Sequence, residues 1–189
     1  IPIALSRHSR GEIALFSVSP SGRPGQLPDL LEAPFQRIGA SFAEALGDAA
    51  MAAANFAPFR YCVVSSRTHV PVEAVDGRSV GLGAAVLLRH LSDPAFAAPD
   101  PDWVFTGDIT PEGTTRSLLT DASGRDYGTK LQALGTRTLV YPTADRREVE
   151  DIGVHADQTA RLEAVATLAE AEALVTRHLA GRAAYQRAL

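Results

Sequence analysis

The chain is poor in cysteine and has no long apolar run. Its single cysteine, Cys62, excludes a disulfide framework and any metal site built on several cysteines. No apolar stretch is long enough to span a bilayer and no signal peptide is recognisable, so we expect a cytoplasmic protein that does not act at a membrane. The formal net charge is −4 and no basic run occurs, which argues against a nucleic-acid partner.

Lysine is almost absent. Of the 18 basic Lys and Arg residues, 17 are arginine, and Lys130 is the only lysine. Arginine keeps its proton inside proteins, whereas a desolvated lysine can lose it. Lys130 is therefore either a surface lysine that is present by chance or a residue whose role requires an amine that can lose its proton. Composition does not decide between these two interpretations.

What is present is the composition of an ordinary globular protein. The chain has 189 residues, 46% hydrophobic and 21% charged, which is enough to bury one core, so we expect a single domain over residues 1–189. Because residue 1 is isoleucine rather than methionine, the chain is a candidate fragment of a longer protein or a processed product.

Hydrophobic periodicity predicts alternating strands and helices. Strands are expected at residues 12–18, 61–64, 103–105, 138–141 and 162–166, with an extended continuation at 68–72. Helices are expected at 33–54, 79–90, around 130–134, at 145–152 and at 168–179. Turns or loops are expected at 20–25, 92–102, 112–113 and 120–128. This alternation, without repeats, predicts the α/β (α+β) class.

One serine lies in a motif that is typical of nucleophiles. Residues 76–83 read Asp-Gly-Arg-Ser-Val-Gly-Leu-Gly, and an apolar helical run follows directly. Ser79 matches the Gly-x-Ser-x-Gly pattern at a helix N-terminus, where free backbone N–H groups can stabilise an oxyanion. The alternative is a serine that only caps the helix, beside glycines that make a tight turn.

Ser79 needs a base, because a serine hydroxyl is a weak nucleophile at neutral pH. A histidine would make a Ser-His-Asp hydrolase; His155, in a polar loop, is the better candidate, and His178, within the last helix, is more typical of a boundary residue. Lys130 would make a Ser–Lys dyad if burial kept its amine neutral. The residues alone leave both open, and no His or carboxylate cluster has metal-ligand spacing.

Several segments, in the right order, resemble the proteolytic domain of Lon-type Ser–Lys peptidases. They are His69-Val70-Pro71, Asp76-Gly77-Arg78-Ser79-Val80-Gly81, Thr106-Gly107-Asp108-Ile109-Thr110 with Gly113, the stretch from Lys130 to Pro142, the acidic stretch from Arg147 to Ile152, and a closing strand and helix at 162–179. The resemblance covers nearly the whole chain and implies a Lon-like fold of mixed sheets with packed helices.

The resemblance also implies roles for the residues that match. Ser79 would be the nucleophile, Lys130 the general base, and Thr106 the residue that hydrogen-bonds near the lysine and orients it. Asp76 would lie at the mouth of the site. The backbone N–H groups of residues 77–79 would form the oxyanion hole. No metal and no cofactor are implied in this domain.

The implied activity is cleavage of protein or peptide substrates through an acyl-enzyme. The resemblance further implies a homo-oligomer, often a hexamer, and ATP-dependent proteolysis through an ATPase module that lies outside these residues or on a separate chain. Two departures stand out: Arg78 and Val80 replace the usual proline and alanine, and the segment between Gly113 and Lys130 is longer than in the family. They motivate the alternative of a catalytically degenerate Lon-fold module that acts in assembly or partner binding.

Overall fold

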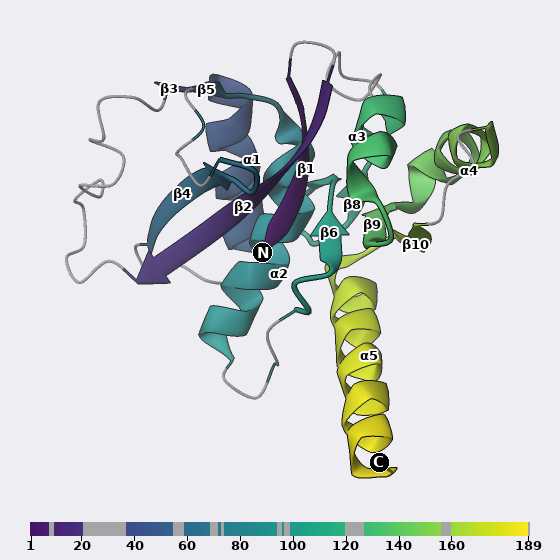
Figure 1. The fold of residues 1–189 in the computed structure, drawn as a ribbon. Helices are drawn as coiled ribbons and strands as arrows, with labels where there is room; N and C mark the ends of the chain where they lie inside the picture. Colours follow the sequence, from purple (N-terminus) through teal and green to yellow (C-terminus); the bar gives the residue numbers. More distant parts are fainter. Residues whose placement is uncertain are drawn as a thin grey trace.

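The computed structural model describes residues 1–7, 10–20, 37–54, 59–68, 72, 74–93, 96, 99–119, 127–155 and 160–188 (Figure 1). The strands are β1 (Pro2–Arg7), β2 (Arg10–Pro20), β3 (Arg37–Ile38), β4 (Phe59–Ser65), β5 (Ala74–Val75), β6 (Trp103–Phe105), β7 (Asp108–Ile109), β8 (Thr115–Arg116), β9 (Thr138–Pro142) and β10 (Arg161–Val165). The helices are α1 (Ala40–Ala52), α2 (Gly81–Ser92), α3 (Tyr127–Leu134), α4 (Arg146–His155) and α5 (Leu168–Ala188), with single 3-10 turns η1 (Arg78–Val80) and η3 (Thr143–Asp145).

A mixed six-stranded sheet, in the order β10-β9-β6-β1-β2-β4, forms the centre of the molecule. The four strands from β10 to β1 run parallel to one another, whereas β2 is antiparallel to both β1 and β4. Two small sheets lie outside it: β3 pairs with β5, and β7 pairs with β8 in a hairpin. The protein is therefore of the α/β (α+β) class, as the sequence predicted.

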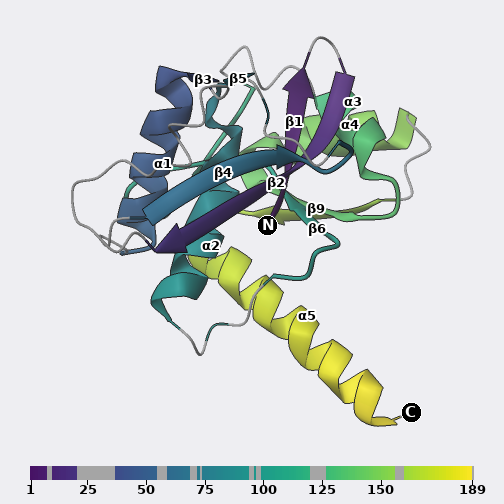
Figure 2. The same cartoon turned by 60° about the vertical axis from the view of Figure 1, so that its left-hand side comes forward.

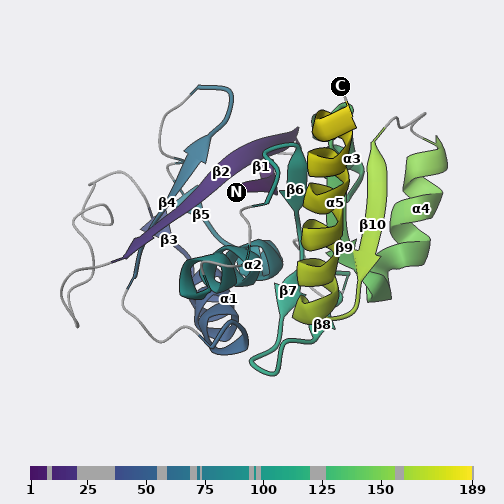
Figure 3. The same cartoon turned by 90° about the horizontal axis from the view of Figure 1, so that it is seen from below.

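Helices cover both faces of the large sheet. Neighbouring strand residues point to opposite faces, so Ile3 of β1 packs in a core with α1, α2 and α5, whereas Ala4 packs in a second core with α3 and α4. The helices α1 and α2 lie against each other (Figure 3). The last helix, α5, extends away from the rest of the molecule to the C-terminus (Figure 2).

Most expected elements are confirmed, but the first helix is shorter than expected. The sequence predicted a helix from residue 33, and α1 begins at Ala40, with residues 33–36 outside the described part. Gly39 donates its N–H to the carbonyl of Val75 at 2.9 Å, and a Cβ on Gly39 would lie 2.0 Å from Cγ of Asp76. This contact with a distant segment holds residues 37–38 as the strand β3 and fixes where the helix starts.

Four other expectations are corrected. Strand β1 was not predicted, and β2 runs through Pro20, where a turn was expected. Thr68 lies in a turn rather than in an extended strand, while residues 69–71 and most of the expected loop at 120–128 fall outside the described part. His155 was expected in a polar loop but is the last residue of α4, because that helix continues beyond the expected end at residue 152.

Candidate functional site

The expected site residues gather where β6 ends. Thr106 and Gly107 follow this strand, and the carbonyl of Ser79 accepts a hydrogen bond from the Gly107 N–H at 2.9 Å. The amine of Lys130 donates to the Thr106 hydroxyl at 3.3 Å. The turn that carries Ser79 and the helix that carries Lys130 thus pack in the two separate cores, and the Ser79 carbonyl and the Lys130 amine contact consecutive residues. The carboxyl ends of parallel strands commonly hold the sites of α/β proteins.

A glycine makes this junction possible. Gly107 has a φ of 151°, which glycine adopts without strain, and a Cβ there would lie 2.9 Å from the ring of Pro142. Its carbonyl accepts a hydrogen bond from the N–H of Leu82 at 2.8 Å, in the first turn of α2. Gly107 is therefore joined by one backbone bond to Ser79, in η1, and by another to Leu82, in α2.

Ser79 lies inside the 3-10 turn η1, just before α2. Its side chain is 6% exposed. It caps neither helix: the cap of η1 is Gly77, the cap of α2 is Val80, and neither cap makes a side-chain hydrogen bond. Gly77 has a φ of 90°, which favours glycine and sets the sharp entry into the turn. The hydroxyl is thus presented at a helix N-terminus without serving as its cap, contrary to the purely structural alternative.

Lys130 is not a surface residue. Its side chain is 1% exposed, and the neighbouring Leu131 and Leu134 are fully buried. The amine lies 5.5 Å from the centre of the Tyr127 ring, in addition to its bond with Thr106. Burial of this kind penalises the charged form of an amine. The interpretation of Lys130 as a surface lysine that is present by chance is therefore excluded.

A second glycine brings the lysine helix close to the sheet. A Cβ on Gly11, in β2, would lie 1.7 Å from the carbonyl oxygen of Thr129, so any larger residue would push α3 outward. Thr129 directly precedes Lys130, and the position of the amine therefore depends on this close approach of helix to strand.

Arg78 turns away from Ser79 and joins a cluster of ion pairs. Its guanidinium donates to Asp108 at 2.7 Å, to Glu44 at 3.0 Å and to Asp48. The hydrogen bond to Asp108 is the main reason why the pKa of Arg78 is raised. Arg116 of β8 binds the same two aspartates. The bulk and charge of Arg78 therefore tie the serine turn to α1 and to the β7–β8 hairpin.

Asp76 is exposed at the start of the serine segment. One of its carboxylate oxygens accepts a hydrogen bond from the N–H of Gly77 at 2.8 Å, and the carboxylate lies against Gly39. Asp76 therefore supports its own loop, and its expected place at the mouth of the site stays a prediction.

Sequence reasoning missed a buried carboxylate behind the lysine. Asp145 is 1% exposed and accepts hydrogen bonds from the Tyr127 hydroxyl at 2.7 Å, the Leu118 N–H at 3.0 Å and the Ser117 hydroxyl. It was expected only as the first residue of a short helix at 145–152, which carries both acidic and basic side chains. The only indication in the sequence is that Asp145 lies shortly after Pro142, where the strand β9 ends. The carboxyl end of β9 lies beside those of its parallel neighbours β6 and β10.

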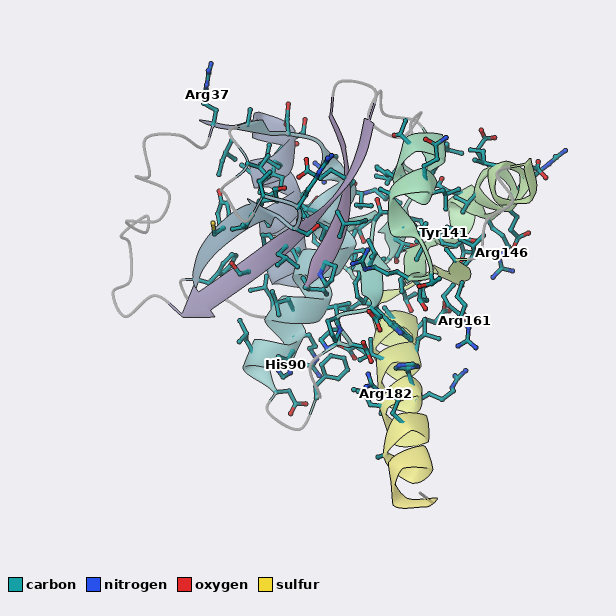
Figure 4. All side chains as sticks on the ribbon, in the orientation of Figure 1. Arg37, His90, Tyr141, Arg146, Arg161 and Arg182 are labelled. Atoms are coloured by element: carbon teal, nitrogen blue, oxygen red, sulfur yellow. The ribbon has the colours of Figure 1, made fainter. Side chains whose placement is uncertain are left out.

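The histidines do not gather with Ser79 in the described part of the chain. His178 lies 3.4 Å from Asp100 and packs on the ring of Trp103, with centroids 4.8 Å apart. Arg182 pairs with the same aspartate, and Figure 4 shows it on α5. His178 therefore helps to hold α5 against the segment before β6. His155 belongs to α4, and its side chain lies outside the described set.

Comparisons with known proteins do not name a family for this chain. No family model matches it, and no curated protein is significantly similar to it. Among the described residues, no group of three or more His, Cys, Asp or Glu side chains could hold a metal ion. No helix within the described ranges combines the length and the apolar character that crossing a membrane requires.

Proposed function

We propose that this chain is a serine peptidase of the Lon type, in which Ser79 is the nucleophile and Lys130 the general base. One observation carries the proposal: the only lysine of the chain is buried and its amine binds Thr106, while the main-chain carbonyl of the buried Ser79 binds the adjoining Gly107. A solvated lysine needs no such environment, whereas a general base that must lose its proton at neutral pH does.

The proposed reaction assigns a role to each of these residues. The neutral amine of Lys130 takes the proton of the Ser79 hydroxyl while the oxygen attacks the substrate carbonyl. The oxyanion is bound by the backbone N–H groups of Arg78 and Ser79, because the N–H of Gly77, which was also expected to contribute, already donates to Asp76. The ammonium then protonates the leaving amine as the peptide bond breaks. Water, deprotonated by the same amine, cleaves the acyl-enzyme. Thr106 accepts a hydrogen bond from the amine and orients it.

The substrates in this proposal are proteins or peptides. The Lon-like fold, a homo-oligomer of hexamer type, and feeding of substrate by an ATPase module in a longer or separate chain belong to the same proposal, because they rest on the matching segments described above. The contacts of Arg78 also support the proposal, because the guanidinium that adds charge to the motif is paired with the carboxylates of Asp108, Asp48 and Glu44.

The test is covalent labelling of Ser79 with a fluorophosphonate or a peptide boronate, together with cleavage of casein. We expect an adduct on Ser79 in the unchanged protein, and loss of both labelling and cleavage in Ser79→Ala and Lys130→Met. Ser92→Ala is the matched control, because this serine lies at the far end of α2, where its hydroxyl donates to the Leu88 carbonyl.

Two results would overturn the proposal. A folded, assembled sample without any Ser79 adduct would favour the degenerate module that acts in assembly or partner binding. Loss of cleavage in His155→Ala, with full activity in Lys130→Met, would favour the Ser-His-Asp hydrolase.

A further inference from the structure

A buried polar cluster lies behind the amine of Lys130. Its centre is Asp145, which accepts three hydrogen bonds, from the Ser117 hydroxyl, the Leu118 N–H at 3.0 Å and the Tyr127 hydroxyl at 2.7 Å. Asp145 and Tyr127 are each only 1% exposed. A buried carboxylate is tolerated when donors surround it in this way, so the cluster holds its members in fixed positions.

The three donors come from both ends of one segment. Ser117 and Leu118 follow β8, Tyr127 is the first residue of α3, and Asp145 lies in η3 after β9. The chain therefore leaves the hairpin and enters the lysine helix at the same carboxylate. This is the stretch in which the sequence is longer than Lon-type domains, so the cluster belongs to a feature particular to this chain.

Tyr127 connects the cluster to Lys130. The two residues are three apart in α3 and therefore lie on the same face of the helix. The amine is 5.5 Å from the ring centre, within the range at which an aromatic face attracts a cation. The Thr106 hydroxyl also contacts the amine, at 3.3 Å. A ring and a hydroxyl thus both define where the amine can be.

We propose that Tyr127, held by Asp145, is a positioning residue that fixes the Lys130 amine for proton transfer with Ser79. The inference rests on the proposed function of that site. The hydroxyl of Tyr127 is tied to Asp145, so the ring cannot turn away from the amine. The ring face also stabilises the ammonium that forms when the amine takes the serine proton, and this offsets part of the cost of creating a buried charge.

The state of the tyrosine suits this role. Burial, and then the hydrogen bond to Asp145, raise the pKa of Tyr127, so the phenol stays protonated and remains a donor wherever an amine titrates. In the cluster described, the tyrosine is therefore a neutral group between Asp145, which accepts the hydrogen bond from its hydroxyl, and the amine near its ring.

The kinetic test compares two substitutions of Tyr127 with a matched control. Tyr127→Phe keeps the ring but loses the bond to Asp145, and Tyr127→Leu loses both. We expect kcat for a peptide substrate to fall about tenfold in the first and about a hundredfold in the second, with KM unchanged, because a displaced catalytic group slows the chemical step. Tyr141→Phe removes another buried hydroxyl, from a tyrosine that lies beside Arg146 (Figure 4), and should leave kcat unchanged.

A second readout does not depend on activity. Because Lys130 is the only lysine, protein made with isotope-labelled lysine gives one set of lysine side-chain NMR signals. The ring current of Tyr127 should displace the signals nearest the amine. We expect that displacement to disappear in Tyr127→Leu and to change in Tyr127→Phe and in Asp145→Asn, but to persist in Ser79→Ala.

The two readouts separate the possible failures. If Ser79 is never labelled but the lysine signals respond to Tyr127, the proposed function is wrong and the placement of the amine by Tyr127 stands. If Ser79 is labelled and Tyr127→Phe and Tyr127→Leu leave both kcat and the lysine signals unchanged, the positioning role is refuted. Should Tyr127→Leu fail to fold, Tyr127→Phe and Asp145→Asn decide by the same signals.

Discussion

The ion-pair cluster beside Ser79 makes a quantitative prediction about stability. Two guanidinium groups share one buried carboxylate: Nε of Arg78 lies 2.7 Å and Nε of Arg116 lies 2.9 Å from the same oxygen of Asp108. The Asp108 side chain is 5% exposed, and both arginines also bind Asp48. We predict that replacing each arginine with methionine is tolerated, whereas replacing both is not.

The magnitudes follow from how exposed each partner is. Arg116 is 42% exposed, so solvent screens its pairs and Arg116→Met should cost only about 0.5–1 kcal/mol. Arg78 is 19% exposed, and Arg78→Met should cost about 1–2 kcal/mol, because Arg116 still compensates Asp108. In the double variant the buried carboxylate has lost both guanidinium groups, and the cost should reach about 4 kcal/mol. The double variant thus loses at least about 1 kcal/mol more than the two single losses combined.

Urea unfolding of the four proteins measures this coupling. Arg89→Met is a matched control, because Arg89 pairs with Glu172 at 3.1 Å on a more exposed surface and should cost less than about 1 kcal/mol. Strictly additive losses, or a double variant as stable as Arg78→Met alone, would refute the reasoning that the two arginines share the burial cost of Asp108. Because the cluster fixes the serine turn, we also expect Arg78→Met to slow the labelling of Ser79, while Arg89→Met does not.

Three further predictions concern the packing and titration of the same region. Gly11→Ala should destabilise the protein by about 2–3 kcal/mol in urea unfolding, because its Cβ would lie 1.7 Å from a carbonyl oxygen of α3; an unchanged midpoint would show that the helix moves freely. Thr106→Val should lower the rate of Ser79 labelling about tenfold, because the Lys130 amine loses the hydroxyl that orients it; an unchanged rate would remove Thr106 from the site. Burial raises the pKa of three tyrosines, Tyr61, Tyr127 and Tyr141. Keeping these three phenols protonated contributes fully to stability below a pH of about 10, where tyrosine in an unfolded chain ionises, and this contribution is lost as the pH rises further. Tyrosinate absorbance from these residues should therefore appear together with unfolding. Its full appearance in a protein that is still native would contradict this prediction.

The sequence predicted those parts of the fold that local patterns decide. The helices α2 and α3 were found from their apolar periodicity, and the strand β6 was found because it is a short run of three large apolar residues after a loop rich in proline and aspartate. Strand β1 was not predicted because it is buried on both faces. Ile3 and Ala4 are both fully buried, so the sequence there does not alternate between apolar and polar residues. The start of α1 was not predicted because it depends on a contact between Gly39 and Asp76, two residues that are far apart in the sequence.

The same division applies to the site. The motif around Ser79 and the composition of the chain singled out Ser79 and Lys130, and the structure places both in buried positions at one strand end. Where Arg78 would bind could not be predicted, because its partners lie on α1 and β7. Asp145 could not be singled out either, since its donors come from segments on both sides of the 120–126 stretch.

The packing of the Ser79 segment and of the Lys130 helix in two separate cores has a consequence for how the protein would respond to heat. The short helix α3 carries only the amine, and the larger core around α1, α2 and α5 carries the hydroxyl. Local openings of small, peripheral elements cost less free energy than global unfolding. We therefore predict that warming displaces α3, with Lys130, while the core around α1, α2 and α5 is still intact, so that the expected labelling of Ser79 is lost before the protein melts and returns on cooling.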